Sequence, residues 1–164
     1  MRRVILLTGL ALAVGVFLPG SALPAVGGSD LPFTASQSGT STANLVTGQA
    51  HLLTTGPVSH FGLAAFEQDL QLVPTGPLTF SYSGTWTLTA ANGDQMFGTS
   101  SGSGSFTDTL HSTWVGNYTS SGGTGRFADA GLTFVGTAHL LRVSLVGAIS
   151  TSSVEGTASG QLSY

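Results

Sequence analysis

The chain has 164 residues, of which 41% are hydrophobic and only 7% are charged, and it contains 24 glycines and no cysteine. All four cationic side chains are arginines, so the absence of lysine excludes a P-loop lysine and a Schiff-base lysine and argues against a basic nucleic-acid surface. The absence of cysteine excludes disulfides, thiolate nucleophiles and sulfur-rich zinc sites. This length accommodates one domain.

The N-terminal segment 1–25 has the pattern of a secretory signal peptide. Arg2 and Arg3 precede a nearly unbroken apolar run, and small residues follow it. Cleavage near Ala22 or Ala25 fits the small-residue rule equally well. The apolar run is about 15 residues long, shorter than the roughly 20 that a transmembrane helix needs, although an uncleaved N-terminal anchor stays an alternative.

We therefore expect an exported protein, secreted or periplasmic, with a flexible segment over 26–39 and a single folded domain over 40–164. Beyond the N-terminal segment the cations are Arg126 and Arg142, while all seven acidic residues remain. Such a chain has no electrostatic reason to bind phosphate backbones or anionic lipid, so we expect no nucleic acid and no membrane contact beyond the signal peptide.

Apolar and hydroxyl side chains alternate from about residue 40 onward. In the clearest stretch, 79–90, serine or threonine occupies nearly every odd-numbered position. The apolar residues share the even-numbered positions: Phe80, Tyr82, Trp86, Leu88 and Ala90. A period of two puts the rings on one face of a strand and the hydroxyls on the other. The same pattern recurs over 131–140 and 153–164, which predicts an all-β domain.

Turn signals divide the domain into about eight strands. Asn92-Gly93 is the strongest hairpin signal, because both residues tolerate positive φ. Between Phe66 and Leu70 the alternation weakens, which indicates a bulge or a helical turn. The expected strands lie over 41–53, 60–73, 78–91, 94–102, 104–110, 112–120, 131–141 and 143–163, the last split in two. Closure into an antiparallel β-barrel removes sheet edges that so few charges cannot protect, and we predict a barrel in preference to a sandwich.

Three blocks carry a family resemblance: His60-Phe61-Gly62, the stretch 85–99 around Asn92-Gly93-Asp94, and the glycine-rich segment 122–131. Together they resemble small secreted bacterial proteins related to the allene oxide cyclase and dirigent barrel group, over roughly 40–164. The resemblance implies an eight-stranded antiparallel barrel with a central cavity. In the glycine-rich segment, the glycines suit a tight turn and Phe127 suits a plug at a barrel end.

The activities of the plant relatives bear on this chain only as fold-level analogy. Those proteins isomerise an unsaturated epoxide fatty acid or steer the coupling of phenoxy radicals, and none of their catalytic residues can be placed here. Relatives with catalytic roles are mostly trimers, so the resemblance implies that form, while the residues themselves leave the oligomeric state open.

Glu67, Asp69 and Arg142 are the candidates for a polar lumen. Glu67 and Asp69 are two residues apart, so both carboxylates share a face of a regular strand. Inside a barrel, such a pair would raise one pKa and could act as acid and base. On the outside it would be a solvated face, and no partner base or nucleophile is evident in the sequence nearby.

Phe80, Tyr82 and Trp86 are the candidates for a ligand pocket, because a small barrel can hold one small ligand. The same rings could fill the core, since eight strands enclose a space just wide enough for side chains. His51 and His139 occupy similar local sequences and could pair, but a metal site needs three or four ligands. We predict no metal site and no cofactor.

The sequence thus favours an exported barrel of unknown activity that binds a small apolar ligand or a surface partner. An isomerase or coupling-directing protein of the dirigent type is the alternative, and it rests on the resemblance alone. A small outer-membrane barrel is a further alternative, suggested by the C-terminal aromatic Tyr164. Against it, the apolar parity is often glycine or alanine and forms no lipid-facing band with two aromatic girdles.

Overall fold

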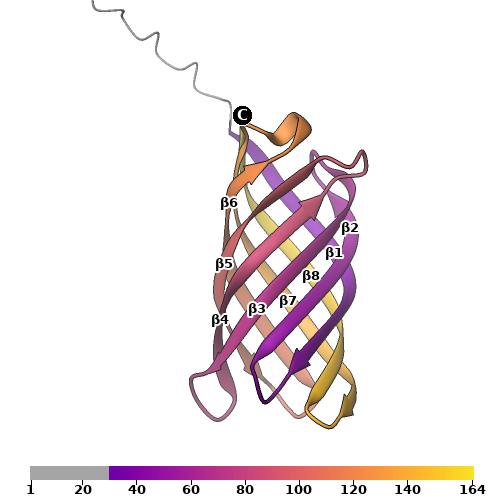
Figure 1. The fold of residues 1–164 in the computed structure, drawn as a ribbon, viewed down its shortest axis with the longest axis vertical. Coiled ribbons are helices and arrows are strands. Elements are labelled where there is room, and N and C mark those ends of the chain that lie inside the picture. Colours follow the sequence, from indigo (N-terminus) through magenta and orange to yellow (C-terminus); the bar gives the residue numbers. More distant parts are fainter. Residues whose placement is uncertain (1–29) are drawn as a thin grey trace, which may run out of the picture.

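The computed structural model describes residues 30–164, which form one closed antiparallel β-barrel (Figure 1). Each strand pairs with the next along the chain, and β1 pairs with β8 to close the sheet. The strands are β1 Leu31–Asn44, β2 Gln49–Val58, β3 Gly62–Pro74, β4 Thr79–Thr89, β5 Gln95–Phe106, β6 His111–Gly123, β7 Gly131–Val146 and β8 Ile149–Ser163, with a short 3₁₀ helix, η1 Gly125–Phe127, before β7. The predicted eight-stranded barrel is confirmed. The expected signal peptide over 1–25 lies outside the described residues.

The alternation in sequence is the alternation between the inside and the outside of the barrel. On β4, Phe80, Tyr82, Trp86 and Leu88 are buried in the lumen, with Trp86 only 2% exposed. The hydroxyl side chains between them face outward. Burial of the apolar face removes it from water, which is the main stabilising contribution to such a fold.

The first strand corrects the expectation of a flexible segment over 26–39. Residues from Leu31 onward belong to β1, which pairs along its length with β8 and over much of its length with β2. Its side chains are mostly small or polar, but the two neighbouring strands satisfy its backbone, and the closure of the barrel depends on it. The strand expected over 41–53 is also wrong, because a turn separates β1 from β2. In that turn the Asn44 side chain accepts the N–H groups of Val46 and Thr47.

Two other strand boundaries differ from the prediction. The glycine-rich stretch around residue 103 does not end the strand, and β5 continues from Gln95 to Phe106. Near the C-terminus, the strand expected over 131–141 extends to Val146 as β7, and β8 begins at Ile149. The split expected within 143–163 thus falls at residues 147–148, and the part before it continues β7. The parity between residues 66 and 70 does not slip, because Gln68 occupies the inward position in a regular register.

Several aromatic rings in the lumen lie over glycines on neighbouring strands. A Cβ atom added to Gly116 would overlap the Tyr82 hydroxyl, and one added to Gly102 would lie 2.6 Å from the same ring. Phe80 covers Gly104 in the same way. Glycine provides the space for each ring, and the ring in turn shields the exposed glycine backbone.

Two different sets of side chains close the ends of the barrel. At the end that carries η1, the rings of Phe61 and Phe127 stack with centroids 4.1 Å apart, and Phe127 is fully buried, as the glycine-rich segment suggested. The Arg126 guanidinium lies 4.7 Å from the centre of the Phe127 ring and donates to the His60 carbonyl at 2.7 Å. At the opposite end, Arg142 lies over Phe106.

Candidate cavity in the barrel lumen

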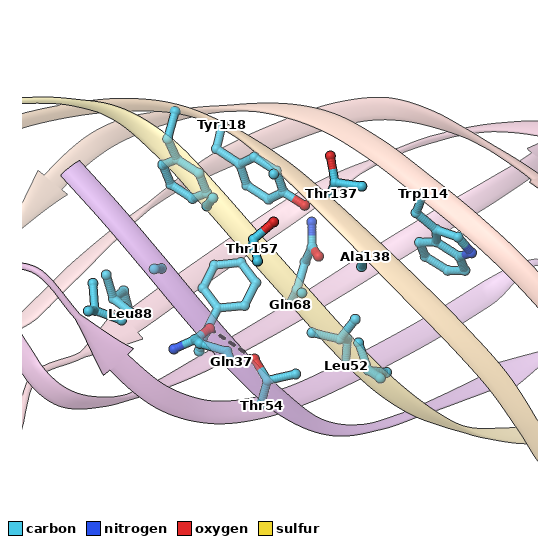
Figure 2. Close-up of a pocket in the computed structure, with 18 of the residues that line it drawn as sticks. Gln37, Leu52, Thr54, Gln68, Leu88, Trp114, Tyr118, Thr137, Ala138 and Thr157 are labelled. Carbon is cyan, nitrogen blue, oxygen red and sulfur yellow. Dashed lines mark hydrogen bonds between the residues drawn. The ribbon is translucent and has the colours of Figure 1, made fainter. Parts of the chain in front are cut away.

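The lumen contains a cavity of about 70 Å³ (Figure 2). One wall of it consists of small residues on β1, β7 and β8: Ala35, Gly136, Ala138, Gly156 and Ala158. The rest of the lining is mainly aromatic, with rings from β3, β4, β6 and β7: Phe66, Tyr82, Trp114, Tyr118 and Phe134. Because alanine and glycine do not reach the centre of the barrel, the space in front of them stays unfilled.

Two glutamines bring polar groups into this apolar space. Gln68 is 2% exposed and donates from Nε2 to the hydroxyl of Ser100 at 2.7 Å. Gln37 accepts from the hydroxyl of Thr54 at 3.0 Å. Figure 2 shows the amide of Gln68 directed toward the hydroxyl of Tyr118. Among the described residues, every buried side-chain nitrogen or oxygen has a hydrogen-bond partner, so the cavity is lined by a satisfied polar set.

Burial shifts the titration of two tyrosines at the cavity. Removal from water raises the pKa of the Tyr82 hydroxyl far above its usual value of 10, and the neighbouring Tyr118 adds to that rise. Burial also raises the pKa of Tyr118, although hydrogen bonding to Tyr82 and Gln68 opposes the rise. Both hydroxyls are therefore neutral at physiological pH.

These raised pKa values predict alkaline destabilisation. In the unfolded chain the tyrosines ionise near pH 10, whereas in the barrel they stay neutral. Their contribution to the free energy of unfolding is therefore fully present below pH 10 and is lost as the pH rises further. We expect the free energy of unfolding, measured by urea denaturation, to fall steeply above pH 10. Tyr82→Phe should flatten this slope. Tyr164→Phe, at a half-exposed side chain, is the matched control and should leave the slope unchanged.

Glu67 and Asp69 share a face, as their spacing predicts, and it is the outer face of β3. Of the two alternatives, the solvated face is therefore correct and the position in the lumen is wrong. Phe66, Gln68 and Leu70 take the inward positions. Outside, the two carboxylates flank the ring of His51, with Nδ1 2.9 Å from Asp69 Oδ1 and Nε2 3.7 Å from Glu67 Oε1. All three side chains are well exposed to solvent.

Arg142 lies far from those carboxylates, at the end of the lumen away from η1. Its Nε donates to the Ser150 hydroxyl at 3.0 Å, and its Nη1 donates to the Thr109 carbonyl at 2.9 Å. It does not line the cavity. The three candidates for a polar lumen are therefore not brought together, and Arg142 helps to close one end of the barrel.

Phe80, Tyr82 and Trp86 all point inward, but only Tyr82 among them lines the cavity. Trp86 donates its indole N–H to the Thr99 carbonyl at 2.9 Å, and Phe80 packs against Trp114 with ring centroids 5.1 Å apart. Phe80 and Trp86 thus fill the core on either side of the cavity.

The main cavity residues that sequence reasoning missed are the two glutamines, the wall of small residues and the rings other than Tyr82, namely Phe66, Trp114, Tyr118 and Phe134. One signal was present for Gln68, because it lies between Phe66 and Leu70 on the apolar parity of β3. A polar residue at an inward position marks a buried hydrogen bond. The wall of small residues gave no such signal, since its members come from three strands.

His51 and His139 are not brought together either. His51 is on β2 and pairs with Asp69, whereas His139 is on β7, in register with Glu155 and with Nδ1 3.2 Å from the Thr113 hydroxyl. Within residues 30–164, no three His, Cys, Asp or Glu side chains are arranged to hold a metal ion. In the same part of the chain, no helix has the length and apolar character to span a bilayer.

The chain was compared with protein-family models, with curated proteins and with solved structures. None of the three comparisons found a significant match.

Proposed function

We propose that the protein is an exported binding barrel that holds a small, mainly apolar molecule in its lumen. The observation that carries this proposal is the cavity itself, which interrupts an otherwise packed core and combines aromatic rings with the amides of Gln37 and Gln68. Binding sites for small molecules have this composition, an apolar lining with a few placed polar groups.

The volume limits the size of the ligand. The cavity of about 70 Å³ is roughly half the size of an engineered cavity of about 150 Å³ that binds benzene. Sites for drug-sized ligands occupy about 300–1,000 Å³. The space therefore suits a molecule no larger than a single ring with one polar substituent, with phenol as an upper limit that small side-chain shifts would admit. A long-chain fatty acid does not fit.

The lining favours binding over catalysis. Among the described residues that line the cavity, the ionisable side chains are Tyr82 and Tyr118, and burial raises the pKa of both. Proton transfer near neutral pH needs a group that titrates there, such as histidine or a perturbed carboxylate. Kinship with the allene oxide cyclase and dirigent group is part of our proposal and is supported by the closed eight-stranded barrel, but the lining gives no reason to transfer an isomerase activity.

The outer wall favours an aqueous compartment over an outer membrane. Outward positions on β4 and β5 are almost all serine or threonine, from Thr79 to Thr89 and from Thr99 to Ser105. A membrane barrel instead presents an apolar band to lipid, bounded by aromatic girdles. This hydroxylated wall supports the secreted or periplasmic location that the N-terminal segment suggests.

The proposal is tested by filling the cavity. Ala138 lines it from β7, so Ala138→Leu should occupy the ligand space and, as a cavity-filling change, stabilise the fold by about 0.5–2 kcal/mol. We expect phenol and benzene to raise the melting temperature of the unmodified protein in a concentration-dependent way. In Ala138→Leu that rise should disappear.

Ala65→Leu is the matched control, because it makes the same change on the outer face of β3 and should retain the ligand response. Isothermal titration calorimetry with the same two compounds gives an independent readout. Absence of any response to either compound in the unmodified protein would contradict the proposed binding function. An equal response in Ala138→Leu would place binding elsewhere on the molecule.

A further inference from the structure

The four turns at the end of the barrel opposite η1 carry exposed aliphatic side chains at their tips. These are the turns β1–β2, β3–β4, β5–β6 and β7–β8, which reach a similar level at the lower end of Figure 1. We call this set the apolar crown and define it by six residues: Leu45, Val46, Leu78, Leu110, Leu145 and Val146.

The crown is far more exposed than aliphatic side chains in a folded core. Val46 is 83% exposed and Val146 is 75% exposed, and the other four members are about half exposed. Scattered exposed leucines are ordinary, but every turn at this end contributes at least one member. A concentration of exposed aliphatic side chains at one pole of a barrel with a hydroxylated wall marks a contact surface.

The same end carries few ionisable side chains and no excess of positive charge. Within the described residues 44–49, 73–79, 106–112 and 141–150, the ionisable side chains are Asp108, His111 and Arg142. The Asp108 carboxylate accepts the N–H groups of Leu110 and His111 at 2.7 and 2.8 Å, which lowers its pKa to about 2. Its other partner is the His111 ring at 2.8 Å, and Arg142 is bound to Ser150 and the Thr109 carbonyl.

The turns at the end that carries η1 are charged instead of aliphatic. They carry His60, Asp94, Arg126 and Asp129, and Arg126 and Asp94 form an ion pair with Nε 3.8 Å from Oδ2. Leu63, at the start of β3, is the exposed aliphatic residue chosen at this end for comparison. The barrel thus has one charged pole and one aliphatic pole.

We infer that the apolar crown docks the barrel on the surface of an uncharged lipid bilayer, with the turn tips in the boundary between headgroups and acyl chains. The six side chains stand on four separate turns around a ring, so a rigid protein partner would need a matching ring of pockets. A fluid bilayer accommodates each tip independently, and aliphatic side chains at its interface gain free energy from burial. These turns carry one arginine, Arg142, and one carboxylate, Asp108, so they have no excess of positive charge that would favour anionic over zwitterionic lipid.

This inference is independent of the proposed ligand and departs from the expectation, drawn from composition, that the folded domain has no membrane contact. The crown residues lie in four places along the sequence, and only the barrel brings them to one pole. The contact is peripheral, because the outward serine and threonine side chains of β4 and β5 interrupt any apolar band around the barrel.

The test is co-flotation with phosphatidylcholine vesicles of three proteins: the unmodified chain, the double variant Val46→Asp with Val146→Asp, and Leu63→Asp as the matched control at the charged pole. Each is used as recovered after export, with its N-terminus read by mass spectrometry, so that all three share the same N-terminal segment. We expect the double variant to lose about tenfold or more in vesicle affinity, because carboxylates must leave water at the interface. Leu63→Asp should bind as the unmodified protein does, and phosphatidylglycerol vesicles should bind no more tightly.

A second readout reports which part of the barrel enters the lipid. Leu78→Trp should show a blue-shifted emission and quenching by brominated phosphatidylcholine, whereas Leu63→Trp should show neither. Failure of the unmodified chain to float with vesicles would overturn the proposal, as would equal binding by the double variant. A dimer that light scattering detects without lipid and that the double variant abolishes would identify a second copy of the chain as the occupant, and would also overturn it.

Discussion

Phe134→Ala is expected to lower the free energy of unfolding by about 3–5 kcal/mol, because it empties the centre of the aromatic cluster. The Phe134 ring stacks on Tyr118 with centroids 4.4 Å apart and contacts the rings of Phe33 and Trp86 at 5.1 and 5.6 Å. It also lines the cavity, so its removal enlarges the existing space by most of a ring. Urea denaturation followed by tryptophan fluorescence measures the loss.

The enlarged cavity of Phe134→Ala should also bind a ligand that offsets part of the lost stability. Benzene should bind Phe134→Ala more tightly than the unmodified barrel and restore part of the lost stability, since ligand binding to the folded state shifts the equilibrium toward it. Phe134→Leu, which preserves more of the volume, should lose less stability and show little benzene response. A loss below about 1 kcal/mol in Phe134→Ala would show that the lumen collapses around the site, contrary to the packing described above.

The second large effect is expected at a glycine. Gly116→Ala should destabilise the barrel by about 1–3 kcal/mol or more, because the added methyl group would overlap the Tyr82 hydroxyl. The Tyr82 ring also covers Gly102 and packs against Trp114 at 5.5 Å, so its hydroxyl can withdraw only by moving the ring into the cavity and giving up these contacts. Thermal unfolding monitored by circular dichroism provides the measurement.

Gly156→Ala is the matched control for that substitution. Gly156 is also an inward glycine within a strand, but a Cβ atom there would approach nothing closer than the Thr137 carbonyl at 3.4 Å. Alanine at this position should be neutral or slightly stabilising, because it restricts the unfolded chain without a clash. Equal destabilisation at both positions would contradict the explanation from ring packing and would indicate a general intolerance of β-carbons in these strands.

Local alternation was sufficient to predict the architecture. The parity of Phe80, Tyr82 and Trp86 identified the inner face of β4, and the scarcity of charges favoured closure over open edges. The predicted strand boundaries were less accurate where the side chains are small. β1 and β5 are rich in serine and glycine and have little hydrophobic signal, so their strand conformation depends on the neighbours with which they pair.

The side of the wall on which Glu67 and Asp69 lie was left open by the sequence for a related reason. The spacing of Glu67 and Asp69 shows that they share a face, but it does not show which face points inward. That choice is made by Phe66 and Leu70, whose burial turns the carboxylates outward, with Gln68 retained inside by its hydrogen bond to Ser100. A pattern of period two specifies relative orientation, and burial of the larger apolar area selects its direction.

From its sequence alone, this chain determines a wall of strands with an apolar and a hydroxylated side, because side-chain direction alternates at every residue along a strand. The cavity and the apolar crown depend on tertiary structure. The small side chains of Gly136, Ala138 and Gly156 form a single wall only when β7 and β8 lie side by side. Val46 and Val146 lie at the same pole only when β1 closes against β8. Both features arise from distances between residues remote in the chain, which local periodicity does not encode and barrel closure fixes.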